Sequence, residues 1–178
     1  MKRLSVIVCF LAITAVAGSA QAQQTVPTNS GKFALTAQAV ALPGGGQTVA
    51  GTVVGATYAI TPKLSLRNDD ILAPANDFQG YFGGAQFWLP IKFLAKTNLS
   101  ALAPYVTASI GIDRVVPASL SAQPGAPSQQ HIAVLVGGGF NWKPSAGPEV
   151  NLIEVRWARL PGLATNTAVV SSGFTLNF

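Results

Sequence analysis

The sequence predicts an all-β fold, an eight-stranded antiparallel up-and-down transmembrane β-barrel, from three observations. First, stretches of about 10 to 15 residues alternate in polarity with period two, and Gly, Pro, Asn, Asp or Ser separate them. Second, in several stretches the charged residues share one face and the aliphatic residues share the other. Third, 49% of the residues are hydrophobic and only 10% are charged, which leaves little charge for a surface in water.

The N-terminus has the features of a secretory signal peptide. Lys2 and Arg3 precede the apolar run Leu4–Gly18, and small residues follow it. Ala20 and Ala22 form an A-x-A cleavage site, so we expect cleavage after Ala22. Cleavage after Ala20 and retention as an uncleaved anchor are the alternatives.

We therefore expect three segments: a signal peptide over 1–22, a polar leader over 23–31 and the barrel over 32–178. After the signal peptide no apolar run approaches the roughly 20 residues of a transmembrane helix. Cys9 is the only cysteine, and it would be removed on export, which excludes disulfides and thiolate metal sites from the exported chain. The remaining positive charge is weak and scattered, which argues against a nucleic-acid partner.

Each of the eight alternating stretches is expected to form one strand. The clearest is the last, where Phe174 and Leu176 share one face and Thr175 and Asn177 share the other. The second is ambiguous, because its valines do not choose a single face. The expected strands are Lys32–Leu42, Gln47–Thr61, Lys63–Ala73, Gln79–Pro90, Pro104–Val116, Gln130–Trp142, Glu149–Arg159 and Thr167–Phe178.

Charged residues distinguish the inside of the barrel from the outside. A soluble sandwich would place its charged face in water, whereas a membrane barrel turns that face inward, where opposite charges can pair away from lipid. The signal peptide and the scarcity of charge favour the membrane barrel. Eight strands enclose an interior just wide enough for side chains, so we expect a filled lumen and no open pore. The expected lumen charge network consists of Arg67, Asp69, Asp113, Glu154 and Arg156.

Aromatic residues are expected to mark the two edges of the apolar wall. We expect both termini of the barrel segment on one side of the membrane, with the odd strands running away from it. One aromatic belt then falls on that side. Its interfacial members are Phe33, Tyr58, Phe87, Tyr105, Phe140 and Trp142, and Trp88 and Phe178 fall on the same side. The opposite rim receives Phe78, Tyr81, Phe82 and Trp157.

Two connections are long. Ile91–Ala103 is expected to form a short interfacial helix with Phe93 facing lipid. Pro117–Gln129 is the longest outer loop. Asp77 is the only charged residue expected in the outer loops, which argues against a highly charged receptor surface.

No motif for catalysis or cofactor binding stands out. The glycine clusters Gly44–Gly46 and Gly137–Gly139 lack the pattern of a phosphate-binding loop, so turns and close strand packing explain them. His131 is the only histidine, which excludes a multi-histidine metal site. It lies near Ser128, but we expect no carboxylate to orient it. Asp69 and its neighbour Asp70 point to opposite faces, which is typical of a strand end. We predict no cofactor, no metal and no catalytic residue.

The end of the chain carries a family resemblance. Apolar residues alternate through Phe174–Phe178 and end in a terminal Phe, which resembles the C-terminal strand signature of Gram-negative outer-membrane β-barrels. The chain after the signal peptide resembles the small eight-stranded OmpA/OmpX-like class. This resemblance implies export, periplasmic chaperones, and insertion by the barrel-assembly machinery. It also implies that Phe174, Leu176 and Phe178 form the assembly signal, and that outer-membrane lipids surround the barrel.

Three functions are compatible with these observations. The leading hypothesis is an integral barrel of the bacterial outer membrane with a structural or surface-interaction role, whose extracellular ligand the sequence does not identify. The second is an outer-membrane lipid-modifying hydrolase that uses His131. The third is a secreted lipocalin-like barrel that binds an apolar ligand.

Overall fold

The computed structural model describes residues 32–44, 47–74, 78–91, 101–115, 128–143, 148–161 and 165–178. The expected signal peptide and leader, Asp77, the middle of the Ile91–Ala103 connection and most of the Pro117–Gln129 loop lie outside the described residues. Within the described ranges, no helix is long and apolar enough to cross a membrane.

Eight strands account for nearly all of the described chain, and each end lies within two residues of its expected position. The prediction of eight strands is confirmed. The strands are β1 (Phe33–Gly44), β2 (Gln47–Ala59), β3 (Leu64–Ala73), β4 (Phe78–Trp88), β5 (Leu102–Val115), β6 (Gln129–Trp142), β7 (Glu149–Leu160) and β8 (Thr165–Asn177).

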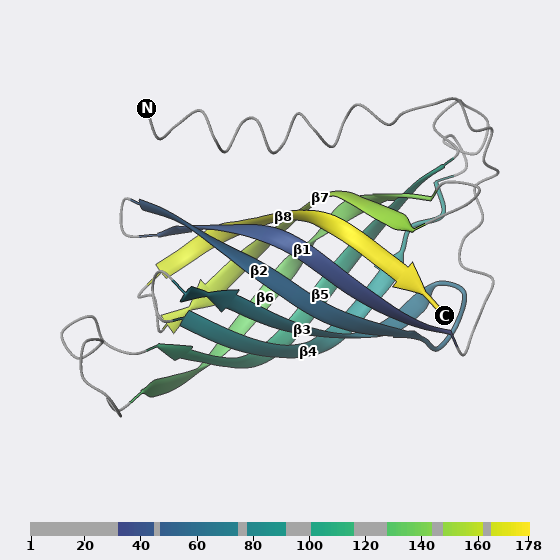
Figure 1. Ribbon diagram of the computed structural model, residues 1–178. Coiled ribbons are helices and arrows are strands. Elements are labelled where there is room, and N and C mark those ends of the chain that lie inside the picture. Colours follow the sequence, from purple (N-terminus) through teal and green to yellow (C-terminus); the bar gives the residue numbers. More distant parts are fainter. Residues whose placement is uncertain are drawn as a thin grey trace, which may run out of the picture.

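The strands close into one antiparallel barrel in chain order (Figure 1). Each strand pairs with its neighbours in sequence, and β1 pairs with β8 from Ala34↔Asn177 to Ala41↔Val170. Closure leaves no strand edge with unpaired backbone groups, which is the condition for a sheet in lipid. The predicted fold class is confirmed. We call the end where β1 begins and β8 ends the terminal end, and the opposite end the distal end.

Alternation along each strand separates an inner face from an outer face. In β5, Thr107, Ser109 and Asp113 are buried inside, whereas Val106 and Ile110 are exposed outside. This is the period-two pattern of a strand with two different environments on its faces. The ambiguous second stretch resolves in the same way, with one set of valines inward and the other outward.

Strand β7 contains an irregularity that alternation alone does not predict. Its register with β6 and β8 shifts between Asn151 and Glu154, so that Leu152 and Ile153 are both exposed on the outer face. A bulge of this kind adds a residue to one strand and re-aims the side chains beyond it. As a result Asn151 and Glu154, three residues apart, both point into the barrel.

Candidate functional site

The middle of the barrel interior contains four charged side chains from two opposite strands. Arg67 and Asp69 project from β3, and Glu154 and Arg156 project from β7. All four are buried, with Arg67 6% exposed and the others at most 1%. The structure thus brings together four of the five residues of the expected lumen network.

The four groups pair in an alternating ring of charge. Arg67 Nη1 and Nη2 donate to the two carboxylate oxygens of Glu154 at 2.7 and 2.9 Å, and Arg67 Nε donates to Asp69 Oδ2 at 2.8 Å. Arg156 Nη1 donates to Asp69 Oδ2 at 2.5 Å, and its Nε lies 3.6 Å from Glu154 Oε1. Two guanidinium groups and two carboxylates leave no net charge, as burial requires.

Neutral polar side chains complete this ionic layer. Gln38 of β1 donates to Glu154 Oε2 at 3.4 Å, and Ser171 of β8 donates to the same oxygen at 3.5 Å. Gln86 of β4 accepts from Arg67 Nη1 at 3.4 Å. The layer therefore links β1, β3, β4, β7 and β8 across the interior. Sequence analysis did not assign the two glutamines to it, although their positions in the alternation place them inside.

A second polar layer lies toward the terminal end. Asn151 Nδ2 donates to Tyr105 Oη at 2.5 Å and to Asn141 Oδ1 at 2.8 Å, and Asn141 in turn donates to Glu149. Lys143 Nζ lies 3.2 Å from Glu149 Oε2.

Trp88 adds an aromatic contact to this terminal layer. Its ring packs edge-on against Tyr105 at 5.4 Å, and Lys143 Nζ lies 4.4 Å from the centre of the same ring. A cation over an aromatic face is attracted by the negative potential of the ring. Polar and aromatic side chains therefore contact one another at this end of the interior.

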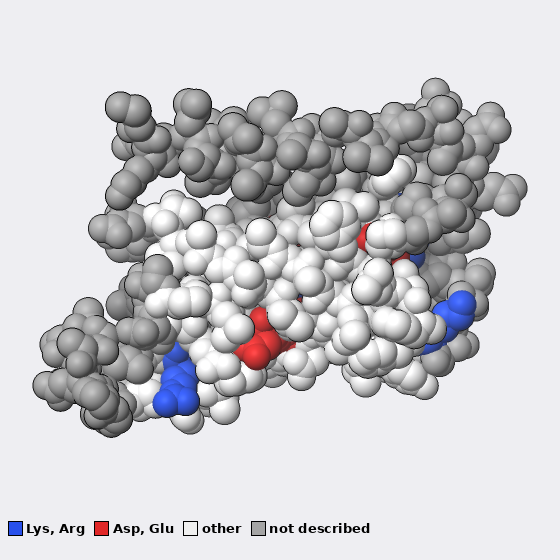
Figure 2. Space-filling model, in the orientation of Figure 1, with Lys and Arg blue, Asp and Glu red and all other residues white. Residues whose placement is uncertain are grey.

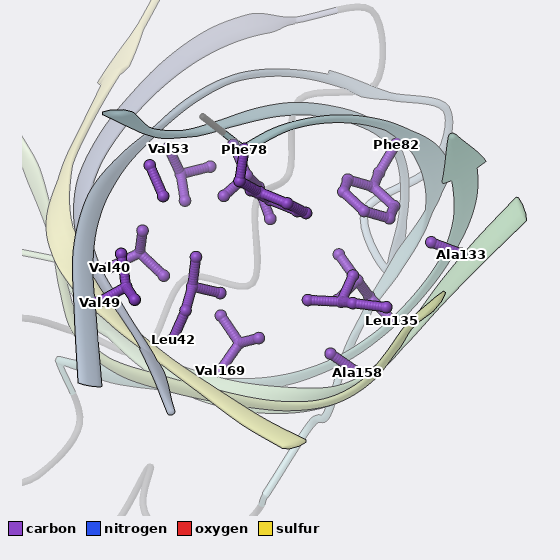
Figure 3. Close-up of a cluster of buried hydrophobic side chains, with 13 residues drawn as sticks. Val40, Leu42, Val49, Val53, Phe78, Phe82, Ala133, Leu135, Ala158 and Val169 are labelled. Carbon is purple, nitrogen blue, oxygen red and sulfur yellow. The ribbon is translucent and has the colours of Figure 1, made fainter. Parts of the chain in front are cut away.

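Apolar side chains cluster in the distal half of the interior (Figure 3). Buried side chains from every strand except β5 converge there, with Phe82 2% exposed and Leu135 fully buried. This cluster was not predicted. Its buried members are Val40, Leu42, Val49, Val53, Ile71, Ala73, Phe78, Phe82, Ala133, Leu135, Ala158, Leu160 and Val169.

Asp113 belongs to a different site from the one expected. It lies near the distal end of β5, and its Oδ1 is 3.2 Å from His131 Nδ1 on β6, its register partner. The structure thus places Asp113 beside His131, at a different depth from the four residues of the ionic layer, because alternation fixes the face of a residue but not its depth. The expectation that no carboxylate orients His131 was wrong.

Four of the aromatics assigned to the belts face inward. Trp88 is buried against Tyr105. Tyr105 is 2% exposed and bonded to Asn151, so it is not an interfacial residue. Phe78 and Phe82 belong to the distal apolar cluster and not to the opposite rim. Tyr81 and Trp157 do lie on the outer face at that end, each 50% exposed. The other members of the terminal belt lie on the outer face: Phe33, Tyr58, Phe87, Phe140 and Trp142.

The outer wall is predominantly apolar. Ile110, Ile132 and Leu66 are more than half exposed on it. Figure 2 shows few charged atoms on one side of the molecule, with basic groups toward the two ends, an acidic patch near the middle and a smaller acidic area at the upper right. The three C-terminal residues of the expected assembly signal are exposed on this wall or at its edge: Phe174, Leu176 and Phe178.

Asp70 is the acidic residue of the described chain that lies on this outer wall. Its register partners are Val54 on β2 and Tyr81 on β4, both exposed outside. The expectation that Asp70 marks a strand end was wrong, because β3 continues to Ala73.

The described residues contain no group of three or more His, Cys, Asp or Glu side chains that could hold a metal ion.

The fold is the one found in small eight-stranded outer-membrane β-barrels, as the C-terminal signature led us to expect. The structure is similar to the N-terminal β-barrel domain of Pseudomonas aeruginosa OprF, with a TM-score of 0.57 and 14% identity over 84% of this chain and 98% of that chain. The outer membrane protein OprG of Pseudomonas aeruginosa gives a TM-score of 0.52 and 15% identity over 86% and 98%. A de novo designed transmembrane β-barrel gives 0.54 and 14% over 84% and 98%. No protein-family model and no curated protein matches the sequence.

Proposed function

We propose that the protein is an integral barrel of the bacterial outer membrane with a structural or surface-interaction role and a lumen closed by its own side chains. The observation that carries this proposal is that the polar and apolar faces of the sheet are inverted relative to a soluble protein. Buried ion pairs lie inside the barrel, whereas large apolar side chains cover the outside. An apolar surface of this extent is stable in lipid and would aggregate in water.

Cell fractionation tests the location. The full chain, expressed in a Gram-negative host, should separate with the outer membrane, and the folded barrel should run differently from the heated one on a gel. Recovery as a soluble periplasmic protein would contradict the proposal and favour the lipocalin-like alternative.

Two layers of side chains along the barrel axis support the proposal that the lumen is closed to ions. The ionic layer links five strands, and the distal apolar cluster fills the interior beyond it. An ion would have to displace paired charges and then pass the side chains of the apolar cluster. Purified protein in planar bilayers should show no steady conductance in membranes where a large porin conducts. Regular single-channel steps from this protein would contradict closure.

Assembly partners follow from the exposed C-terminal residues. We propose that the barrel-assembly machinery and periplasmic chaperones act on β8, with Phe174, Leu176 and Phe178 as the signal. These side chains project outward, where a partner can reach them before the barrel closes. In the folded barrel Phe178 contributes an exposed ring and one backbone hydrogen bond, from its N–H to Phe33 O.

Deletion of Phe178 should therefore reduce the level of the protein in the outer membrane of cells by several-fold. The purified deletion variant should refold in detergent and lose only about 1–2 kcal/mol of stability. Ala substitution of Ile132, which is equally exposed but lies on β6, is the matched control. Normal membrane levels of the deletion variant would contradict the signal.

A second candidate function is hydrolysis of an outer-membrane lipid, and the Asp113–His131 pair is the observation that favours it. A buried carboxylate that holds Nδ1 leaves Nε2 of His131 free to act as a base. Ser128, however, lies three residues before His131, and an odd separation in extended chain places the two side chains on opposite faces. Release of labelled fatty acid from lipid A by the protein, abolished in His131→Ala, would establish this function. The absence of any release would exclude it.

A further inference from the structure

The outer wall is not uniform around the barrel. On β5 and β6 it presents bulky aliphatics such as Ile110, Ile112 and Ile132. In the middle of β2, β3 and β4 it presents smaller and more polar side chains, with the bulky Leu66, Tyr58 and Phe87 nearer the terminal end. We call this second area the β2–β4 face, and its residues are Val54, Ala56, Asn68, Asp70, Tyr81, Gly83 and Ala85.

Asp70 lies within the membrane-spanning height of this face. It is six residues from Leu64 at the terminal end of β3 and three from Ala73 at the distal end. Tilted strands rise about 2.5 Å per residue along the barrel axis, which places Asp70 about 15 Å from one end of the strand and about 8 Å from the other. An ionisable group on a lipid-facing wall is costly and marks a functional surface.

No hydrogen bond joins the carboxylate of Asp70 to a described residue, and its Oδ1 is among the buried oxygens without a partner there. Tyr81, its register partner on β4, carries a donor on the same face. The hydroxyl of Tyr81 accepts a hydrogen bond from the side chain of Gln79, so its own proton is available to a further acceptor.

The Asp70 carboxylate is a hydrogen-bond acceptor and the Tyr81 hydroxyl is a donor, so a second copy of the chain can supply a partner for each. Two barrels in the same membrane have the same orientation and are related by a two-fold axis along the membrane normal, so residues meet residues of similar depth. Register partners differ in depth by about 3 Å in a barrel with this tilt. Asp70 of each copy can therefore accept from Tyr81 of the other, in two equivalent hydrogen bonds.

The surroundings permit the two walls to approach. A methyl group added at Gly83 would meet nothing within 4 Å, so the wall is open at that point, and Ala56 and Ala85 are small. Small residues at a membrane interface allow close backbone approach and direct polar contacts. The bulky aliphatics of β5 and β6 suit fluid lipid instead.

We propose that the β2–β4 face is the interface of a symmetric dimer in the membrane, held by reciprocal hydrogen bonds between Asp70 and Tyr81. This inference rests on the proposed membrane location.

Disulfide trapping tests the interface. The chain from Gln23 onward contains no cysteine, so single cysteines can be placed at will. Gly83→Cys lies in the middle of β4 on the proposed interface, with Ala85→Cys as a second label. Val155→Cys lies in the middle of β7, on a strand outside the β2–β4 face, and is the matched control. In lipid vesicles, oxidation should trap dimers at the two β4 positions and only collisional background at Val155.

Side-chain variants in the Gly83→Cys background test the hydrogen bonds. Asp70→Leu and Tyr81→Phe should each weaken dimerisation by roughly 3- to 10-fold. Asp70→Asn keeps a carbonyl acceptor and should retain more dimer than Asp70→Leu. Each variant should still show heat-modifiable mobility, which establishes that the barrel is folded.

Three results would each overturn the dimer. The first is equal disulfide trapping on β4 and β7, and the second is a monomer at the highest protein-to-lipid ratio. The third is dimerisation that neither Asp70→Leu nor Tyr81→Phe weakens. If any of these results is obtained but the Val155→Cys protein inserts into vesicles, the dimer is overturned and the proposed membrane location stands. Failure of that protein to insert would overturn the proposed function and the dimer with it.

Discussion

Glu154 is the residue on which the ionic layer depends. Its carboxylate is fully buried and accepts two hydrogen bonds from Arg67, one from Gln38 and one from Ser171. The two arginines of the layer cannot be hydrated where they lie, so removal of Glu154 would leave positive charge without compensation. A buried ion pair is costly to break even where its net contribution to stability is small.

Replacement of Glu154 by Ala should lower the free energy of unfolding by about 3–5 kcal/mol, measured by denaturant in lipid vesicles. Val155→Ala, one residue further on the outer face, is the control and should cost about 1 kcal/mol or less. A loss at Glu154 no larger than the loss at Val155 would show that the network contributes nothing to the fold.

Alternation placed single residues on the correct face but did not identify their partners. Arg67, Asp69, Glu154 and Arg156 point inward as expected, and contact follows because β3 and β7 lie opposite each other at similar depth. Asp113 shares the inner face but lies close to the distal mouth, where His131 is its neighbour. Depth depends on strand tilt and register, which the period of the sequence does not contain.

Among the elements, β6 and β7 approach each other closely at two glycines. Gly137 and Gly139 face β7, and an added Cβ at Gly137 would overlap the carbonyl oxygen of Val155. The glycine cluster therefore has a packing role at these positions, in agreement with its interpretation from sequence. The strand pair could not hold a larger side chain there without a backbone shift.

Gly137→Ala should accordingly destabilise the barrel by about 1–3 kcal/mol, because the new methyl group separates two hydrogen-bonded strands. Gly83→Ala has open space for the same methyl group and should be neutral or stabilising by up to about 1 kcal/mol. Equilibrium unfolding in dilute detergent, where the protein is monomeric, measures both. Equal effects of the two substitutions would contradict the close approach of β6 and β7.

Strand positions were predictable because the signals for them are local. Period two and the intervening turn residues fixed all eight strands to within two residues. The bulge in β7 was not predictable, because it arises from pairing with β6 and β8 and not from the composition of Leu152 and Ile153. The faces of β2 were ambiguous for a related reason. Val49 and Val53 point into an apolar part of the lumen, while Val54 faces outward.

At the scale of the whole molecule, the interior changes character along the barrel axis. Polar and ionic layers lie in the terminal half, and the apolar cluster of Figure 3 lies in the distal half. Sequence analysis placed Phe78 and Phe82 near the opposite rim, whereas both point into this cluster. The outer wall is apolar between its ends, with Asp70 as the described acidic exception.

The central claim is that lipid surrounds this wall, and a depth gradient in the cost of charge tests it most directly. Ile110 is 61% exposed in the interior of β5, and Trp142 lies at the terminal end of β6. In lipid vesicles, Ile110→Arg should cost roughly 2–4 kcal/mol of unfolding free energy beyond Ile110→Ala, whereas Trp142→Arg should cost about 0–1 kcal/mol beyond Trp142→Ala. Equal penalties at the two sites, or none at Ile110, would contradict a membrane-spanning barrel.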